Sequence, residues 1–543
     1  MLAKTRKVVC GRPQFFRHFR IVLLCVSAVL ASLSVLAFAE SKPSLLVNGE
    51  TLIGTHSAVA GVDAFLGVPF AAAPTGALRW QAPREFRGSG GARRADRFAP
   101  ACMQSPRILD WYRGMAERFG ASRSAFADLD ISEDCLYLNV WAPTKAADSS
   151  LATALPVMVF VHGGSNRSGW SFEPNYHGHQ LAAQGVVVVS VAYRLGVFGF
   201  FSHPQLPGAN FGLQDQLEAL RWVRRNIESF GGDPQRVTVF GESSGAGNIA
   251  ALMLSPASRG LLQRAILQSG GDFGWPKIRT LAEEKARGLE LARALDARRP
   301  PKIEALQRVD AKTLLRVAEE VYRDHYHAPV IDGEIVTSGL EEQLARGDWP
   351  LQQLLIGSNA NEYYSANAGA GDPAAVDRAV AEADILHTPA VRDALSTTPD
   401  VALALDRLAT AESMLCPAQG LATGVARAGR AVWMYQFSRV RDGAAAAQLR
   451  AYHGAELPYV FGTHDAWLPT SEEDWQLTRR MMAAWVEFAR TGSPVAESSE
   501  WPKFTAPGPR NVLQWDAPFD GRTDVIDSPE PELCRIYAEQ IKR

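Results

Sequence analysis

The chain has 543 residues, a formal net charge of -2 at pH 7, 47% hydrophobic residues and 21% charged residues. This composition is typical of a globular protein that can bury a large core, and length alone would allow three or four domains. Beyond the N-terminus there is no basic run and no basic stripe interleaved with aromatic residues, so nothing indicates a nucleic-acid partner.

The first 39 residues have the pattern of a secretion signal. A basic leader precedes an apolar run from Ile21 to Phe38, and Ala37-Phe38-Ala39 has the small-x-small form of a signal-peptidase site. We expect cleavage after Ala39 and a secreted or periplasmic protein. A membrane anchor is the alternative, because the run approaches the ~20 residues that span a bilayer. Cys25 follows a bulky leucine, so we do not interpret it as a lipid attachment site.

Four cysteines remain after the leader, an even number that predicts two disulfides in an exported protein. Spacing alone leaves all three possible pairings open. The four are Cys102, Cys135, Cys416 and Cys534.

Continuous apolar runs alternate with helical patterns along the chain. Runs that are apolar at every position suit parallel strands covered on both faces, and the alternation predicts a mostly parallel sheet between helices. The predicted strands are 64–70, 156–162, 186–191, 237–240 and 354–356. The predicted helices are 214–229, 246–254, 281–323 and 479–490.

A G-x-S-x-G pattern, Gly241-Glu242-Ser243-Ser244-Gly245, stands between the strand 237–240 and the helix 246–254. This strand–turn–helix context is what a nucleophile elbow requires, because the strained turn leaves no room for side chains beside the serine. The sequence therefore predicts Ser243 as a nucleophile. Glu242 adds a second carboxylate, which we expect to tune local charge.

Two longer motifs carry a family resemblance. Residues 230–245, which begin Phe-Gly-Gly-Asp-Pro, and residues 133–140, Glu-Asp-Cys-Leu-Tyr-Leu-Asn-Val, resemble the two hallmark motifs of the type-B carboxylesterases, which include the cholinesterases. Further similar stretches run from Phe65 to Pro502. The resemblance implies one α/β-hydrolase domain over residues 40–543, with a large mostly parallel sheet and helices on both faces. It implies a serine hydrolase that cleaves carboxylic esters.

An ester hydrolase needs backbone N–H groups that stabilise the oxyanion. In this fold one comes from the residue after the nucleophile, Ser244, and others come from a glycine-rich loop after an earlier strand. By resemblance Gly164 and Ser165 donate and Gly163 shapes the turn. The family usually has glycine or alanine where this chain has Ser165 and Ser244, so two hydroxyls are added to the hole.

The nucleophile needs a histidine and an orienting carboxylate, in the chain order serine, acid, histidine. His453 begins the segment His453–Gly462, which resembles the family's histidine loop, and His464 is the alternative. Glu362 follows the strand 354–356 and occupies the place of the family's acid, although Tyr363 replaces the usual glycine after it.

We expect no metal and no cofactor, a small-molecule ester as the partner, and no stable membrane insertion once the signal is removed. His325 and His327 could be mistaken for a metal pair, but no further ligands follow at a suitable spacing.

Four residues near the predicted centre are candidates for substrate binding: Asn166, Arg167, Trp170 and Glu242. Asn166 and Arg167 replace the aromatic residue usual in the family after the oxyanion glycines. Because a guanidinium suits carboxylates, Arg167 raises the hypothesis of polar or carboxylate-bearing esters. The alternatives are that Arg167 faces solvent or pairs with an acid such as Glu173. A loop over 104–129, with Trp111 and Tyr112, is expected to cover part of the site.

The resemblance also implies structural pairs: Arg79 with Glu133, Arg194 with Asp215, Cys102 with Cys135, and Cys416 with Cys534.

Two other functions compete with the hydrolysis of soluble esters. One is a cholinesterase-like binding protein that has lost catalysis, which the complete Ser243, Glu362 and His453 set disfavours. The other is a lipase, which would need a large apolar lid.

Overall fold

The computed structural model describes residues 41–144, 154–271, 279–296, 298, 301–347, 349–495, 501–516 and 524–541. Internal contacts divide the chain into two units, Met1–Pro43 and Ser44–Arg543. The predicted leader lies outside the described residues, and the elements of the fold belong to the second unit.

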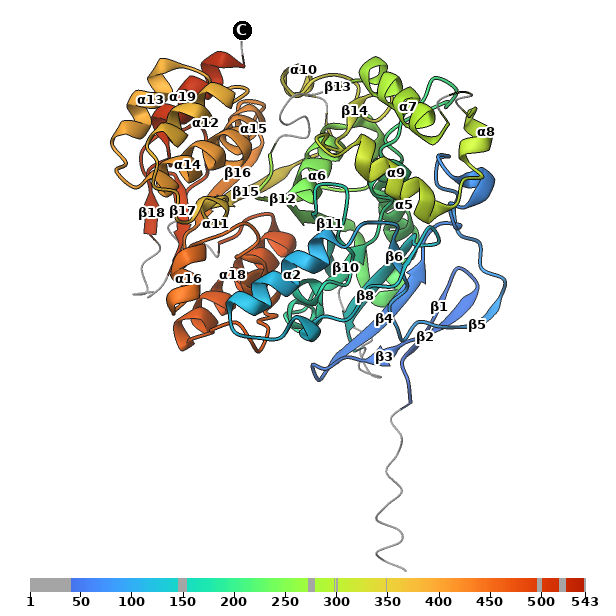
Figure 1. Ribbon diagram of the computed structural model, residues 1–543. Coiled ribbons are helices and arrows are strands. Elements are labelled where there is room, and N and C mark those ends of the chain that lie inside the picture. The colour runs from blue at the N-terminus through green and yellow to red at the C-terminus, as the bar shows by residue number, and fades with distance from the viewer. Residues whose placement is uncertain are drawn as a thin grey trace, which may run out of the picture. The chain divides into compact units, whose positions relative to one another are not determined.

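An 11-stranded sheet forms the centre of this unit in the described residues (Figure 1). The strands from β17 to β10 are parallel to their neighbours, and antiparallel pairs occur only toward the two edges. In spatial order the strands are β18 (Asp524–Ile526), β17 (Val512–Trp515), β16 (Ala431–Phe437), β15 (Gln353–Asn359), β12 (Arg264–Gln268), β11 (Gly232–Glu242), β9 (Leu155–Val161), β10 (Val187–Val191), β8 (Tyr137–Pro143), β4 (Val62–Pro69) and β3 (Thr55–His56). The mostly parallel sheet predicted from the apolar runs is confirmed.

Smaller sheets join the remaining strands. They are β1 (Ser44–Val47), β2 (Glu50–Ile53) and β5 (Gly91–Arg94) in one sheet, β6 (Ala101–Cys102) with β7 (Ile131–Ser132), and β13 (Arg279–Thr280) with β14 (Val330–Ile331).

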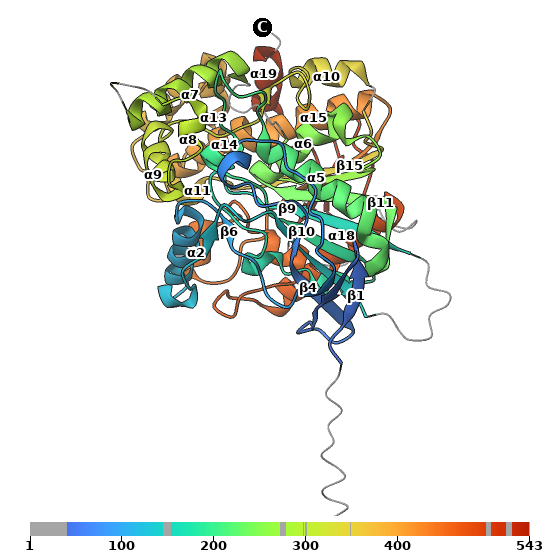
Figure 2. The same cartoon turned by 90° about the vertical axis from the view of Figure 1, so that its right-hand side faces the viewer.

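Helices cover both faces of the large sheet, as the two views together show (Figure 1, Figure 2). Their bounds are α2 (Arg107–Arg118), α3 (His179–Ala182), α4 (Gly196–Gly199), α5 (Phe211–Asn226), α6 (Ser244–Leu254), α7 (Leu281–Leu295), α8 (Ile303–Leu306), α9 (Ala311–Val321), α10 (Leu340–Arg346), α11 (Tyr364–Asn367), α12 (Ala374–Glu382), α13 (Pro389–Ser396), α14 (Val401–Thr410), α15 (Cys416–Arg427), α16 (Ala444–Leu449), α17 (Leu457–Phe461), α18 (Glu472–Thr491) and α19 (Pro531–Gln540).

The alternation of side chains along each central strand produces two separate cores. In β9, Val157 and Val159 pack in a core with α5, α6 and α15, whereas Met158 and Phe160 pack in a second core with α17 and α18. Successive side chains of a strand point to opposite faces, so a strand that is apolar at every position needs a cover on both. This explains why the runs lack the polar alternation of a half-exposed sheet.

Several segments differ in detail from expectation, among them the predicted helix 479–490, which begins earlier, at Glu472 of α18. The helical region within 281–323 is divided into α7, α8 and α9, and Asp310 starts α9 by accepting a hydrogen bond from the backbone N–H of Thr313 at 3.0 Å. The covering segment 104–129, expected as a loop, contains the amphipathic helix α2, whose Leu109 and Tyr112 are buried.

Both cysteine pairs implied by the resemblance are joined, Cys102 to Cys135 and Cys416 to Cys534. The two ion pairs are also present: Arg79 contacts Glu133 at 2.6 Å and Arg194 contacts Asp215 at 2.7 Å. Within the described ranges, no helix combines the length and the apolar character needed to cross a bilayer.

Candidate active site

The strand β11 and the helix α6 meet in a sharp turn at Ser243. The backbone of Ser243 has φ 56° and ψ -129°, a conformation that non-glycine residues rarely adopt and that is found where strain serves function. A Cβ on Gly241 would lie 2.6 Å from the carbonyl oxygen of Val161, and one on Gly245 would collide with the same oxygen. The flanking glycines are therefore required by close packing against β9, as the G-x-S-x-G pattern predicts.

The three residues predicted as a triad lie in hydrogen-bonding order. Ser243 Oγ is 2.9 Å from His453 Nε2, and His453 Nδ1 is 2.7 Å from Glu362 Oε2. With its proton on Nδ1, facing Glu362, the imidazole can accept the Ser243 proton at Nε2. The alternative base, His464, has its ring nitrogens bonded to Arg441 at 2.8 Å and Thr478 at 2.7 Å.

The acid and the histidine are held by loops that hydrogen-bond to each other. Asn359, at the end of β15, donates its side-chain amide to the Tyr452 carbonyl at 2.7 Å, next to His453. The backbone N–H of Asn359 donates to Glu362 Oε1 at 2.7 Å, which leaves Oε2 for the imidazole. Tyr363, the departure from the family pattern, lies nearly parallel to the His453 ring at 6.5 Å and does not displace the acid.

The predicted oxyanion loop follows β9 and lies against the elbow. A Cβ on Gly163 would lie 2.9 Å from the Ser243 Cβ, so only glycine permits this approach. No other described residue accepts a hydrogen bond from the backbone N–H groups of Gly164, Ser165 and Ser244. These three donors are thus free to bind an oxyanion, and Ser244 also stands at the positive N-terminal end of α6.

Two further carboxyl groups surround the imidazole. Glu242 Oε1 lies 3.1 Å from His453 Nε2, and burial raises the pKa of Glu242 to about 8. Burial lowers the pKa of His453, but the carboxylates of Glu242 and Glu362 outweigh it and hold that pKa above its ordinary value. The arrangement favours the imidazolium that forms when a serine gives up its proton.

The second further carboxyl group near His453 is that of Glu456, which the sequence analysis did not predict as a site residue. It is fully buried, and its oxygens accept hydrogen bonds from the side-chain amides of Asn359 at 2.7 Å and Gln268 at 3.0 Å. Burial raises its pKa. A glutamate three residues after His453 within an otherwise apolar segment was the available signal.

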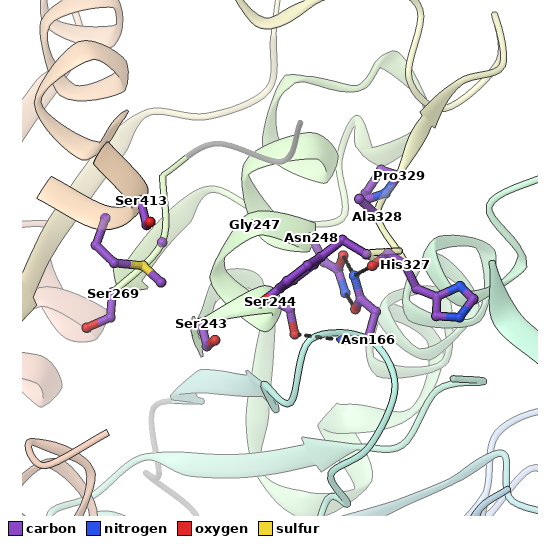
Figure 3. A pocket seen from close by; sticks show the side chains of 13 residues that line it. Asn166, Ser243, Ser244, Gly247, Asn248, Ser269, His327, Ala328, Pro329 and Ser413 are labelled. Atoms are coloured by element: carbon purple, nitrogen blue, oxygen red, sulfur yellow. Dashed lines mark hydrogen bonds between the residues drawn. The ribbon is translucent and has the colours of Figure 1, made fainter. Parts of the chain in front are cut away.

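A pocket of about 520 Å³, which includes its open mouth, extends from Ser243 over the first turns of α6 (Figure 3). Serine and asparagine residues contribute to its wall, but Asn166 and Asn248 bury their amides against each other, and the exposed wall is more apolar than polar. The lining residues are Asn166, Ser243, Ser244, Gly247, Asn248, Ser269, Gly270, Tyr326, His327, Ala328, Pro329, Ser413 and Met414. This space adjoins Ser243 and is open to part of a substrate.

The four candidates for substrate binding fall in different places. Asn166 lines the pocket and Glu242 contacts His453. Arg167 is outside the set of lining residues, because its guanidinium pairs with Glu319 at 2.8 Å. Trp170 packs in the core beneath α2. The acid that pairs with Arg167 is therefore Glu319, and the expected alternative, Glu173, instead accepts from the Tyr112 hydroxyl at 2.7 Å.

His327 lines the pocket and His325 lies next to it, with ring centroids 6.3 Å apart, and neither resembles a metal ligand. His325 Nε2 is 2.9 Å from Glu284 and 3.1 Å from the Arg279 guanidinium, whose positive charge opposes a bound cation. His327 packs against Tyr322. Across the part of the chain that the structure describes, no three His, Cys, Asp or Glu side chains are grouped so as to hold a metal ion.

Comparison with known proteins places this geometry in a family. The profile of the carboxylesterase family matches residues 43–530. The chain belongs to the carboxylesterase family. It is 35% identical over 514 residues to the fumonisin B1 esterase of Sphingopyxis macrogoltabida, covering 88% of each chain. It is 32% identical over 494 residues to the para-nitrobenzyl esterase of Bacillus subtilis, covering 87% of this chain and 94% of the other.

Solved structures of carboxylesterases share the fold. A thermophilic para-nitrobenzyl esterase superposes with a TM-score of 0.76 at 30% identity, covering 91% of this chain and all of the other. The carboxylesterase of Geobacillus stearothermophilus gives a TM-score of 0.75 at 29% identity over 91% of this chain and 99% of the other. The α/β-hydrolase fold is confirmed, and the protein is a serine hydrolase of the carboxylesterase family whose substrate is an ester.

Proposed function

We propose that the protein cleaves carboxylic esters through an acyl-enzyme on Ser243, with His453 as base and Glu362 as orienting acid. The observation that carries this proposal is the chain of hydrogen bonds from Ser243 Oγ to His453 at 2.9 Å and from His453 to Glu362 at 2.7 Å. The three free N–H groups of Gly164, Ser165 and Ser244 supply the electrophilic half of the site.

The reaction follows from these positions. Ser243 Oγ attacks the ester carbonyl carbon while His453 Nε2 takes its proton, and the carbonyl oxygen becomes an oxyanion held by the backbone donors. The C–O bond to the alcohol then breaks, and His453 returns the proton to the departing alcohol. A water molecule, deprotonated by His453, attacks the acyl-enzyme and releases the acid and free Ser243.

A substitution at Ser243 tests the proposal. Ser243→Ala should lower kcat for a short p-nitrophenyl ester by up to ~10⁶, because the acyl-enzyme cannot form. The control is Ser168→Ala, which removes a buried hydroxyl that has no hydrogen-bond partner among the described residues. An organophosphate should label wild type and control at one site and leave Ser243→Ala unlabelled. Near-normal turnover by folded Ser243→Ala would overturn the assignment.

We further propose that the acyl group of the substrate is polar or bears a carboxylate. The relatives are named for different esters, so family membership leaves this choice open. Support comes from the guanidinium groups that lie near His327 in the pocket wall. Burial first, and then the positive charges of Arg167 and Arg279, lower the pKa of His327 in that wall. Glu319 and Glu284 pair with these two guanidinium groups, and a positive potential that remains at the wall would favour an anionic acyl group.

The test compares kcat/KM for a neutral ester and its carboxylate-bearing analogue. Arg167→Ala should reduce the preference for the charged ester. Glu319→Gln should increase it, because the substitution leaves the positive charge of Arg167 without its anion. Arg167→Lys keeps the charge and is the matched control. Equal ratios in all four enzymes would remove Arg167 from substrate recognition.

A further inference from the structure

The oxyanion loop has an unusual backbone for the residues that it contains. Gly164, Ser165 and Asn166 follow one another with φ values of 105°, 59° and 53°, all in the left-handed region. Serine and asparagine adopt this region at a cost, and a run of such residues persists only where the surroundings hold it in place. Since Gly164 and Ser165 present the free N–H groups, whatever holds the loop also sets the oxyanion hole.

The first contact that holds the loop comes from the elbow itself. The backbone N–H of Asn166 donates to the Ser244 hydroxyl at 3.1 Å, and Figure 3 shows the Ser244 side chain directed at Asn166. This bond joins the two halves of the hole, because Ser244 supplies one donor through its own N–H and fixes the other half through its hydroxyl. Alanine, which the carboxylesterases often have at this position, could not form this hydrogen bond.

The Asn166 side chain supplies the remaining contacts. Its amide oxygen accepts from Asn248 Nδ2 at 2.8 Å, and its Nδ2 donates to the His327 carbonyl at 2.9 Å. The Tyr193 hydroxyl lies 3.3 Å from the same amide oxygen. Asn166 is only 3% exposed, so its amide is committed to protein and not to substrate.

We infer that the Ser244 hydroxyl is a positioning group, which sets the oxyanion donors of the 164–165 loop through the backbone of Asn166, while Asn248 holds the Asn166 side chain. The inference rests on the proposed esterase function and deepens it. Asn166 is thus a positioning residue, which departs from the substrate-contact role expected from the sequence. Loss of the Ser244 hydroxyl leaves the buried Asn166 N–H without a partner and lets the strained loop relax away from the position of the oxyanion.

The test is Ser244→Ala with a neutral p-nitrophenyl ester. We expect kcat to fall by roughly tenfold with little change in KM, less than the ~10²–10³ seen when an oxyanion donor is lost outright. The inhibition constant of a trifluoromethyl ketone, which forms a tetrahedral adduct with the nucleophile, should rise by a similar factor. Ser244→Thr keeps the hydroxyl and should restore both values, a rescue that a purely structural role would not give.

Asn248→Ala tests the same network from the helix side and covers the case in which Ser244→Ala does not fold. We expect a loss of the same kind, and less than additive losses when the two substitutions are combined. Ser168→Ala should keep wild-type kcat. Wild-type kcat and ketone affinity in folded Ser244→Ala or Asn248→Ala would overturn the inference. A wild type that an organophosphate does not label would instead overturn the proposed function.

Discussion

A single imidazole, that of His453, is surrounded by more negative charge than one triad acid supplies. Glu362 contacts Nδ1 at 2.7 Å, and Glu242 contacts Nε2 at 3.1 Å on the side of the nucleophile. Both carboxyl groups raise the pKa of His453, and burial raises the pKa of Glu242 to about 8. His453 and Glu242 therefore titrate together, and Glu242 controls the pH at which the imidazole becomes free to accept a proton.

This coupling predicts the pH dependence of Glu242→Gln. The proposed mechanism needs neutral His453, so kcat/KM should fall as the pH drops through the pKa of this residue. Removing an anion 3.1 Å away destabilises the imidazolium and lowers that pKa, so the acid limb should move to lower pH by about one unit or more. The measurement is the pH profile of kcat/KM. An acid limb that stays in place would show that Glu242 is uncharged while His453 titrates.

Glu362→Gln tests the acid in the same way. The glutamine amide can donate to Nδ1, which would place the imidazole proton on Nε2 and prevent it from accepting the Ser243 proton. We expect kcat to fall by ~10⁴, as for the corresponding change in other triads. Glu456→Gln is the matched control, because Glu456 is equally buried but bonds to Asn359 and Gln268. If Glu456→Gln lost more activity than Glu362→Gln, the assignment of the acid would be wrong.

Which residues could be predicted from sequence depended on how local their partners are. Ser243 and its glycines form one continuous motif, so the elbow was predictable directly. Whether Asn166 and Arg167 face substrate was not predictable. Their partners Asn248 and Glu319 are 82 and 152 residues away along the chain. No local pattern indicates that these two side chains are already engaged.

Among the secondary-structure elements, two helices depend on a covalent link. The disulfide Cys416–Cys534 joins α15 to α19 across 118 residues, whereas Cys102–Cys135 spans 33 residues around α2. Loop-closure entropy predicts a stabilisation of roughly 4–5 kcal/mol for the longer link and roughly 3–4 kcal/mol for the shorter. Thermal unfolding of the two double Cys→Ala variants should rank them in this order. A larger loss of stability from the shorter link would contradict the entropic account.

The elements themselves were predictable where burial is complete. Strands such as β10 (Val187–Val191) are apolar on both faces because a core lies on each side. The helix α2 was not predicted, although Leu109, Tyr112 and Ala116 have helical spacing. Tyr112 of α2 packs against Phe126 and Trp170, which lie outside the helix. Contacts between separate segments of this kind cannot be predicted from a local sequence pattern.

At the scale of the whole molecule, the order of the strands in the sheet places side by side segments that are far apart along the chain. The neighbouring strands β12 and β15 pair Arg264 with Gln353, and the intervening residues include the pocket wall at 326–329. The sequence predicts that these strands are parallel and buried. Which strands lie next to each other in the sheet depends on all of its strands together, so this order cannot be predicted from any one segment. The family resemblance supplied the topology that local patterns could not.

Removal of residues 1–39 on export is also testable. The family profile begins at residue 43, and the unit that carries the site and both disulfides is Ser44–Arg543. A chain that starts at Glu40 should therefore fold and keep its kcat. Produced in an oxidising compartment it should carry both disulfides, and produced in a reducing cytoplasm it should unfold at a lower temperature. Expression of the full chain in an exporting host should yield an intact mass that begins at Glu40. A product that retains residues 1–39 would favour the membrane anchor over the cleaved signal.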